Sequence, residues 1–334
     1  MPEANSSNQL PAYFILLGIP GLESSYFYIA FIFTIVYVIS VIGNLTLLFI
    51  IGIDRSLHEP MYFFLCMLSA IDLVLSNSTT PKMLGILWSN NHEIYFEACL
   101  TQMFFLHSFA VMESSLLLAM AFDRYVAICQ PLRYNSILTT FLITNIGLLA
   151  ISRALALMTP LPFLIKRLPF CSTNVTHHSY CEHMAVVKLA CVDTTFDSIY
   201  GLVSLFIVGL DVIFIMWSYV LILQAVFRLA STEARYKALS TCAAHICTMI
   251  SFYIPILLSS MVHRFGKDVP LHIYISLANV YLMLPPLINP IVYGVSTKKI
   301  QNRVKSAIKV DFTCFGRVHA AKMELPKWNQ TQHF

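Results

Sequence analysis

Seven long stretches of mostly apolar residues dominate this sequence. They cover residues 27–53, 61–88, 98–129, 140–165, 196–229, 238–262 and 270–295. A helix needs about 20 mainly apolar residues to cross the hydrocarbon core of a membrane, and each stretch is long enough. The stretches show no period-two alternation of polar residues, so they do not resemble strands of a membrane β-barrel. The sequence therefore predicts an all-α membrane protein built as a seven-transmembrane helix bundle.

Composition supports a membrane protein, and the residues outside the apolar stretches are too few for a second globular domain. Of the 334 residues, 57% are hydrophobic and 11% are charged, whereas soluble domains carry about 25% charged residues. The mean hydropathy is +0.72. We expect an extracellular N-terminus (1–26), the bundle (27–296), and a short amphipathic helix 8 with a cytoplasmic tail (297–334). No basic run with interleaved aromatic residues points to nucleic acid.

The distribution of Lys and Arg predicts the orientation. With the N-terminus outside, the cytoplasmic segments hold 14 of these residues and the outer segments hold five, while Lys82 and Arg153 lie within spans. Cytoplasmic loops normally carry the excess of positive charge. Residues 1–25 contain no Lys or Arg, so we expect the first span to act as an uncleaved signal anchor. The chain is therefore predicted to be a multi-pass plasma-membrane protein with its C-terminus inside.

Sequons and cysteines fit this topology. Asn5 and Asn174 begin acceptor motifs on the predicted outer side, Asn174 being the less favoured site. Four cysteines also lie on the outer side, at positions 99, 171, 181 and 191. They imply two disulfides, for which three connectivities are possible. Cys314 follows an amphipathic stretch and is either palmitoylated or an unmodified tail thiol.

Four longer blocks carry a resemblance to a known family. They are LHEPMYFFLCMLSAIDL (57–73), MAFDRYVAICQPLRY (120–134), KALSTCAAHI (237–246) and PPLINPIVYG (285–294). Through them, residues 10–310 resemble the rhodopsin-like G-protein-coupled receptors, and within these the odorant receptors. HRFG (263–266) and the loop 168–191 are similar to the class I, or fish-like, subgroup and to its subfamily 52. This subgroup is associated with carboxylic acids and other water-soluble odorants.

The resemblance implies a switch at the inner end of the bundle. We expect Arg124 to pair with Asp123 at rest and to meet a heterotrimeric G protein, of the stimulatory olfactory type that raises cAMP, once the helices separate. Alternatively, Arg124 only extends to the lipid headgroups. The other residues expected in this inner cleft are Tyr125, Tyr219, Arg235, Lys237, His245, Asn289, Pro290 and Tyr293.

Polar residues deep in the spans suggest a second site. Asn44, Asp72, Glu113 and Asn289 lie within apolar helices, where ionisable residues usually have a function. Two carboxylates that face one cavity cannot both ionise cheaply. Either one is protonated in a neutral hydrogen-bonded network, or a cation lies between them. Since rhodopsin-like receptors often hold sodium here, sodium near Asp72 and Glu113 is our hypothesis.

For a receptor of this family we expect a ligand cavity near the outer end. The expected disulfides are Cys99–Cys181 and Cys171–Cys191, and the first would draw the loop down as a lid. The expected lining comprises His107, Ser108 and Val111 on the third span, Ser260 and Arg264 on the sixth, His183 and Met184 in the loop, and Leu257, Val203, Ile207 and Phe109 as limits on ligand length.

Arg264 is the residue that most directly suggests a ligand class. A guanidinium stays charged at physiological pH and binds a carboxylate through two parallel hydrogen bonds. Small carboxylic (fatty) acids are therefore the predicted ligands. Alternatively, Arg264 pairs with Glu182 or Asp268 and the ligands are neutral alcohols or ketones.

Other classes of protein are less well supported. A transporter would be expected to show internal repeats, and none is visible. No serine–histidine–carboxylate set, metal triad or phosphate loop indicates an enzyme, and no cofactor is implied. His177, His178 and His183 raise metal binding as a rival. Adjacent loop histidines are usually just exposed, however, and no cysteine or carboxylate completes a tetrahedral set that is free of disulfides.

Overall fold

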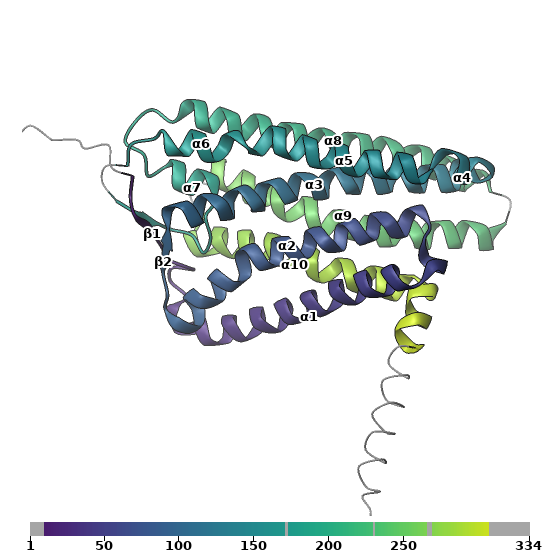
Figure 1. Ribbon diagram of the computed structural model, residues 1–334, viewed down its shortest axis with the longest axis horizontal. Coiled ribbons are helices and arrows are strands. Elements are labelled where there is room, and N and C mark those ends of the chain that lie inside the picture. Colours follow the sequence, from purple (N-terminus) through teal and green to yellow (C-terminus); the bar gives the residue numbers. More distant parts are fainter. Residues whose placement is uncertain (1–9, 171–172, 230, 266–268, 307–334) are drawn as a thin grey trace, which may run out of the picture.

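The computed structural model describes residues 10–170, 173–229, 231–265 and 269–306, and it confirms the seven-helix bundle. Long helices lie side by side along the longest axis of the molecule (Figure 1). The spans are α1 (Tyr26–Ile53), α2 (Pro60–Ser89), α3 (Phe96–Cys129), α5 (Thr140–Met158) continued by α6 (Pro160–Lys166), α8 (Thr195–Arg228), α9 (Thr232–Phe265) and α10 (Leu271–Ser296). We call the end that carries the strands the outer end, and the opposite end the inner end.

Helix α3 lies at the centre of the bundle. Its most apolar stretch is 67% buried, whereas the corresponding stretch is 22% buried both in α5–α6 and in α8. The large apolar side chains exposed on those outer helices match the hydrocarbon of a membrane and not water. Because α3 contacts α2, α5, α8 and α9, side chains on its different faces can reach most of the bundle.

Prolines and one small residue shape the seventh span. Helix α10 contains Pro285, Pro286 and Pro290, each of which removes a helical hydrogen bond. Gly43 of α1 lies directly against Pro290, and a Cβ atom on Gly43 would come within 2.9 Å of the proline ring. Glycine therefore allows α1 and α10 to approach closely at this level.

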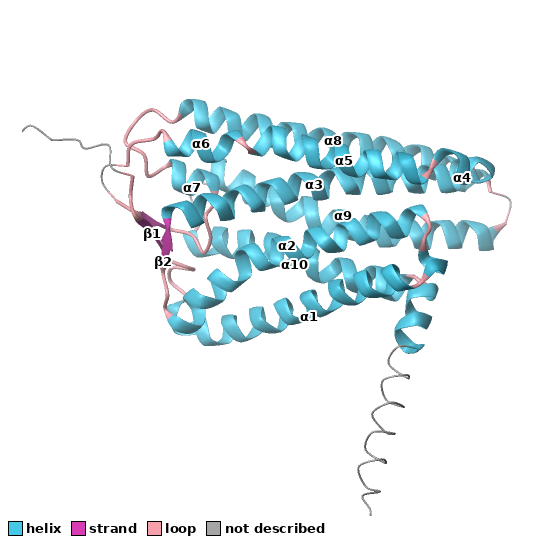
Figure 2. Cartoon of the chain, in the orientation of Figure 1, coloured by secondary structure: helices cyan, strands magenta, loops and turns pink. Residues whose placement is uncertain are grey.

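A small sheet of three strands lies at the outer end; Figure 2 shows β1 and β2 of it in magenta. Strand β1 (Tyr13–Leu16) pairs antiparallel with β2 (Glu93–Tyr95) and parallel with β3 (Val175–Thr176), so the order is β2-β1-β3. From the sequence we expected only helices, with residues 1–26 as an extracellular N-terminus, so this sheet is a correction. After β1 the chain turns at Gly18, whose φ of 78° favours glycine.

The sheet also bears on glycosylation. The Nδ2 of Asn174 donates to the carbonyl oxygen of Tyr13 at 3.1 Å, and Thr176 of the same sequon is 1% exposed within β3. The amide that would carry a glycan is thus engaged in the folded sheet. Asn5 and Cys314 lie outside the described residues, and glycosylation stays a prediction.

At the inner end, the chain turns after α10 and residues 298–306 are helical. This segment leaves the bundle at a steep angle (Figure 1, yellow). Two ion pairs tie it to the turn between α1 and α2: the Nζ of Lys299 lies 2.6 Å from Glu59, and Arg303 pairs with Asp54. The short helix α4 (Tyr134–Ile137) lies at the same end, beyond α3.

Candidate ligand site

A buried cavity of about 140 Å³ opens between the helices near the outer end. It is bounded by α3, α5–α6, α8, α9 and α10, and by α7 (His183–Val187) of the long loop. Five residues predicted from the sequence line it: Ser260, His107, Val111, His183 and Met184. The other lining residues are Leu106, Ala110, Met158, Leu161, Tyr180, Glu182, Gly201, Ser204, Leu205, Val208, Ile256, Ser259, Tyr274 and Tyr281.

Five other predicted ligand residues do not line this cavity. The residues of α3 that line it are Leu106, His107, Ala110 and Val111, and successive helical positions are rotated by about 100°. Ser108 and Phe109 therefore belong to other faces of the helix. The same rotation removes Leu257, Val203 and Ile207 from the lining. Leu257 and Val203 are 40% and 49% exposed, which places them on the outer surface of the bundle.

The predicted anion-binding residue, Arg264, lies in the last turn of α9, which runs without interruption to Phe265. Its side chain lies outside the described residues. Ser260 is four residues earlier on the same helix and lines the cavity. Backbone position alone therefore places Arg264 one helical turn beyond the cavity-lining serine, toward the outer end.

A disulfide fixes the lid of the cavity. Cys99, at the start of α3, is bonded to Cys181 in the loop. The backbone N–H of Cys181 also donates to the Oε1 of Gln102 at 2.9 Å. Helix α7 begins immediately afterwards, with the Oε2 of Glu182 accepting from the N–H of Ala185 at 2.6 Å. His183 and Met184 are thus held over the cavity. Cys171 lies outside the described residues, so the pairing Cys171–Cys191 stays a prediction.

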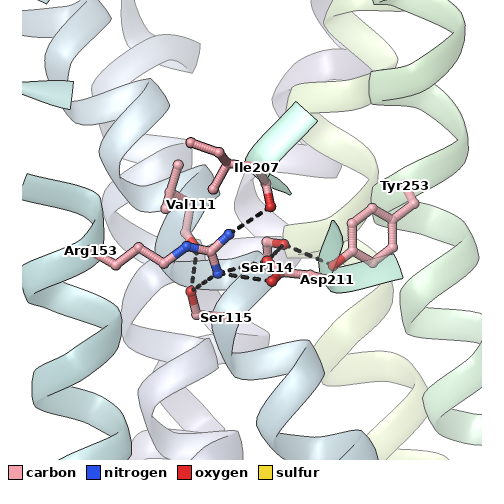
Figure 3. Close-up of polar contacts among 7 residues, drawn as sticks. All are labelled: Val111, Ser114, Ser115, Arg153, Ile207, Asp211 and Tyr253. Atoms are coloured by element: carbon pink, nitrogen blue, oxygen red, sulfur yellow. Dashed lines mark hydrogen bonds and ion pairs between the residues drawn. The ribbon is translucent and has the colours of Figure 1, made fainter. Parts of the chain in front are cut away.

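Just below the cavity lies an ion pair that the sequence analysis did not predict (Figure 3). The Nη1 of Arg153, on α5, donates to both carboxylate oxygens of Asp211, on α8, at 2.9 and 2.8 Å. It also donates to Ser115 at 3.0 Å, while Nη2 donates to the carbonyl oxygen of Ile207 at 3.0 Å. Ile207, expected as a limit on ligand length, instead offers its backbone to this network.

The same carboxylate connects two further helices. The Oγ of Ser114, on α3, donates to Asp211 at 2.5 Å and lies 2.9 Å from the hydroxyl oxygen of Tyr253, on α9. We call Arg153, Asp211, Ser114, Ser115 and Tyr253 the ionic network. Val208, which lines the cavity, comes three residues before Asp211 on α8. Ile256, which also lines it, comes three residues after Tyr253 on α9. The network therefore forms a layer one helical turn beneath the cavity.

From the sequence, Arg153 was noted within a span but had no assigned role, and Asp211 was not singled out. The signal was present, because each charge lies in a predicted apolar helix where an unpaired charge is costly. What the sequence lacked was the evidence that α5 and α8 face each other at these positions.

The predicted polar core is present between α1, α2, α3 and α10. Asn44, Asp72 and Glu113 are 0% exposed, and Asn289 is 1% exposed. The Nδ2 of Asn289 donates to the Oδ2 of Asp72 at 2.9 Å. Among the described residues, Asp72 Oδ1, Asn289 Oδ1 and both oxygens of Glu113 accept no hydrogen bond. Oxygen acceptors without donors suit a hard cation such as sodium, or a protonated Glu113, and the ion remains a hypothesis.

The loop histidines do not form a metal site in the described part of the chain, where no three His, Cys, Asp or Glu side chains are grouped suitably. They face different surroundings. His183 lines the ligand cavity, and His177 lines a separate hollow closer to the surface. The ring of His178 is buried against that of Tyr180, with centroids 4.2 Å apart.

At the inner end, Arg124 forms an ion pair with Asp123. The Oδ1 of Asp123 also accepts from the hydroxyl of Tyr134 at 2.7 Å. The side chains of Asp123 and Arg124 border a small cavity of about 30 Å³ together with His245 and Tyr293. This places four of the predicted switch residues around one space.

The other predicted switch residues do not line this cavity. Asn289 belongs to the polar core, and Pro290 packs against Gly43. Tyr219, on α8, lies with its hydroxyl 2.8 Å from the Nδ1 of His245, on α9. The Nε of Arg235 donates to the carbonyl oxygen of Leu229 at 2.7 Å, and Lys237 is exposed. Tyr125 is partly buried and packs against the core.

Comparison with known proteins decides the family. The olfactory receptor family matches residues 33–310. The chain belongs to the olfactory receptor family. Among human proteins, the receptor is 56% identical to olfactory receptor 52K1 over 307 residues, covering 92% of this chain and 98% of that protein. It is 55% identical to olfactory receptor 52K2 (91% and 97% covered) and 53% identical to olfactory receptor 52P1 (91% and 95% covered).

These likenesses confirm the predicted resemblance to subfamily 52. The olfactory receptor is a G-protein-coupled receptor that binds small odorants, couples to G proteins and spans the plasma membrane several times. It is not an enzyme, since its family is not enzymatic. The ligand cavity near the outer end and the small cavity beside Arg124 near the inner end are the candidate odorant and G-protein sites.

Proposed function

We propose that this olfactory receptor responds to small aliphatic carboxylic acids and activates a stimulatory, olfactory-type G protein that raises cAMP. One observation supports the ligand class most directly: Ser260 lines the cavity, and Arg264 follows it by four residues on the continuous helix α9. Residues four apart share one face of a helix, and an arginine on that face would supply the cation that a carboxylate head group needs.

The rest of the cavity suits the aliphatic part of such a ligand. Leu106, Val111, Leu161, Leu205 and Val208 contribute apolar surface. Each methylene group buried there contributes about 0.8 kcal/mol of binding free energy. A cavity of about 140 Å³ favours short chains, because longer chains would have to displace packed side chains.

Histidine completes the proposed head-group site. The Nε2 of His107 is buried and has no hydrogen-bond partner among the described residues, and the rings of His107 and His183 lie edge to face with centroids 6.5 Å apart. An unpaired buried polar atom costs about 1–3 kcal/mol. A ligand oxygen that accepts a hydrogen bond from His107 would remove that cost, in the tautomer that places the proton on Nε2.

The ligand class can be tested with matched chemicals. Straight-chain acids of increasing length, and the alcohols of equal length, are applied to cells that express the receptor with the stimulatory olfactory G protein, and cAMP is measured. We expect the acids to be the stronger agonists and Arg264→Ala to remove their effect. The control is Lys166→Ala, which removes another outer cation that pairs with Glu97 and does not line the cavity. Unchanged acid potency in Arg264→Ala would refute the role of this arginine.

A second candidate is a receptor for neutral alcohols or ketones. Two observations favour it: Glu182 contributes a carboxylate to the lining, and Ser259, Ser260, Tyr274 and Tyr281 offer neutral hydrogen-bonding groups. A carboxylate in the wall disfavours an anionic ligand unless a cation compensates for it. In the same assay this candidate predicts that alcohols activate the receptor at lower concentrations than acids, with or without Arg264.

A further inference from the structure

A second hollow, the outer cavity, lies closer to the extracellular surface than the ligand cavity and has no assigned role. Its volume is about 400 Å³. It is bounded by β3 and α7 of the long loop, by the outer part of α9, and by the start of α10. Its described lining contains Lys188 and His177 but no Asp or Glu.

Helix α7 and one tyrosine separate the two cavities. His183 and Met184, in the first turn of α7, line the ligand cavity, whereas Ala185 and Lys188 line the outer cavity. Tyr274 of α10 lines both. Since the disulfide of Cys181 holds the start of α7 against α3, this wall is anchored, and the two cavities are neighbouring but distinct spaces.

The outer cavity contains both a charged and an uncharged polar group that can hold an anion. Lys188 is exposed, and no ion pair of its side chain is found among the described residues. Thr176 lines the cavity, is 1% exposed, and has a buried Oγ1 without a hydrogen-bond partner in the described part of the chain. Buried hydroxyl groups are normally hydrogen-bonded, so this threonine indicates a missing partner.

The helices α9 and α10 contribute an apolar wall. Val262 at the end of α9, and Val269 and Leu271 before and at the start of α10, face the same hollow. A ligand that satisfies both walls has an anionic head with hydrogen-bond acceptors and a short hydrocarbon body. A phosphate or other fully polar anion would leave the apolar wall unused, and a pure hydrocarbon would leave Lys188 and Thr176 without partners.

We propose that the outer cavity is a second binding site, for a short aliphatic monocarboxylate whose head group contacts Lys188 and Thr176. The site goes beyond the proposed function, because it is argued from these two residues and not from Arg264. It lies beside Tyr274, so it holds the ligand one side chain away from the ligand cavity.

Protection of an engineered cysteine tests this site directly. Val269 is 36% exposed in the outer cavity, so Val269→Cys should react with a membrane-impermeant methanethiosulfonate reagent on intact cells. The rate is compared with and without hexanoate, and the unsubstituted receptor gives the background. At hexanoate about four times above its dissociation constant, we expect labelling to slow about fivefold, by simple competition. Hexanol, of equal length and uncharged, should protect much less.

Two further variants separate this site from the ligand cavity. Ala110→Phe, or Val111→Trp if the first does not reach the cell surface, fills the deeper cavity. Protection by hexanoate should persist in these variants even though the cAMP response is lost. Lys188→Gln should reduce protection from about fivefold toward about twofold, because an exposed charge contact contributes up to about fivefold in affinity, while Lys188→Arg should retain it.

Each alternative result would overturn the proposal. If filling the deeper cavity abolishes protection, the outer cavity is not a separate site. If hexanol protects as well as hexanoate, or if Lys188→Gln leaves protection unchanged, the site does not recognise a carboxylate. None of these results depends on whether Arg264 proves essential for activation, so the two proposals can fail independently.

Discussion

Removing Arg153 from the ionic network should destabilise the receptor strongly, because it leaves the carboxylate of Asp211 without its cation. Asp211 is 4% exposed and accepts both Nη1 contacts from Arg153. In the described part of the chain its other hydrogen-bond donor is the hydroxyl of Ser114, at 2.5 Å (Figure 3). The variant Arg153→Met preserves much of the side-chain volume but not the charge.

The structure sets the size of the effect. Breaking a buried ion pair by removing one partner costs about 3–5 kcal/mol. The side chain of Arg153 is 22% exposed while that of Asp211 is 6% exposed, so we expect the lower end, about 3 kcal/mol. Replacing both partners, as in Arg153→Met with Asp211→Leu, removes the uncompensated charge. The double variant should therefore recover most of the loss.

The free energies of unfolding can be compared by denaturant unfolding of purified receptor in lipid nanodiscs. We expect a deficit of about 3 kcal/mol for Arg153→Met and of less than about 1.5 kcal/mol for the double variant. The control is Lys166→Met, which breaks the exposed pair with Glu97 and should cost less than about 1 kcal/mol. If the double variant is as unstable as the sum of its single variants, the pair is not coupled and this reasoning is wrong.

Two predictions concern the inner end. Burial, and after it the nearby Asp123 carboxylate, raises the pKa of the Tyr134 hydroxyl, so this hydroxyl remains a hydrogen-bond donor at physiological pH. Tyr134→Phe removes its bond to Asp123 and should raise basal cAMP by up to about tenfold. Unchanged basal cAMP would show that the bond does not restrain the resting state. The backbone N–H of Ser56 is the main cause that lowers the pKa of Asp54. A depressed carboxyl pKa stabilises the folded state above the unfolded pKa of about 4 and loses this effect as pH falls below it. After correction for intrinsic rates, hydrogen exchange of residues 298–306 should accordingly be independent of pH between about 5 and 7. At neutral pH it should be faster in Asp54→Asn than in the unsubstituted receptor. Equal exchange in these two proteins would exclude a role for the ion pair with Arg303.

The helical architecture could be predicted because one physical requirement governs it. A span must be long and apolar, so each of the seven stretches marked a helix. The ends were less well determined: α9 begins at Thr232, six residues before the predicted start at 238, because its first turns are polar and extend beyond the apolar stretch. The sheet at the outer end was missed because strands of two to four residues leave too little pattern to detect.

The ligand site was only partly predictable for a related reason. His107, Ser108 and Val111 were expected on one face of α3, but His107 and Val111 line the cavity and Ser108 does not. Leu257 and Val203 were chosen because they are apolar, and in a membrane protein apolar residues also cover the outside of the bundle. Hydrophobicity therefore does not separate the lining of a cavity from the lipid-facing surface. Only the packing of neighbouring helices does so, and a single sequence does not contain it.

The central position of β1 in the outer sheet has a consequence for biosynthesis. Ile15 is made early, but its partner in β3 is Val175, so 160 residues and four spans must be synthesised before the parallel pairing can form. Until then the edge of β1 that will face β3 has unpaired backbone groups, even after β2 has paired with its other edge, and exposed strand edges favour association with other chains. Closure of this sheet is thus a late step in maturation. A receptor arrested before its fourth span is complete would display a free edge that quality-control factors can recognise.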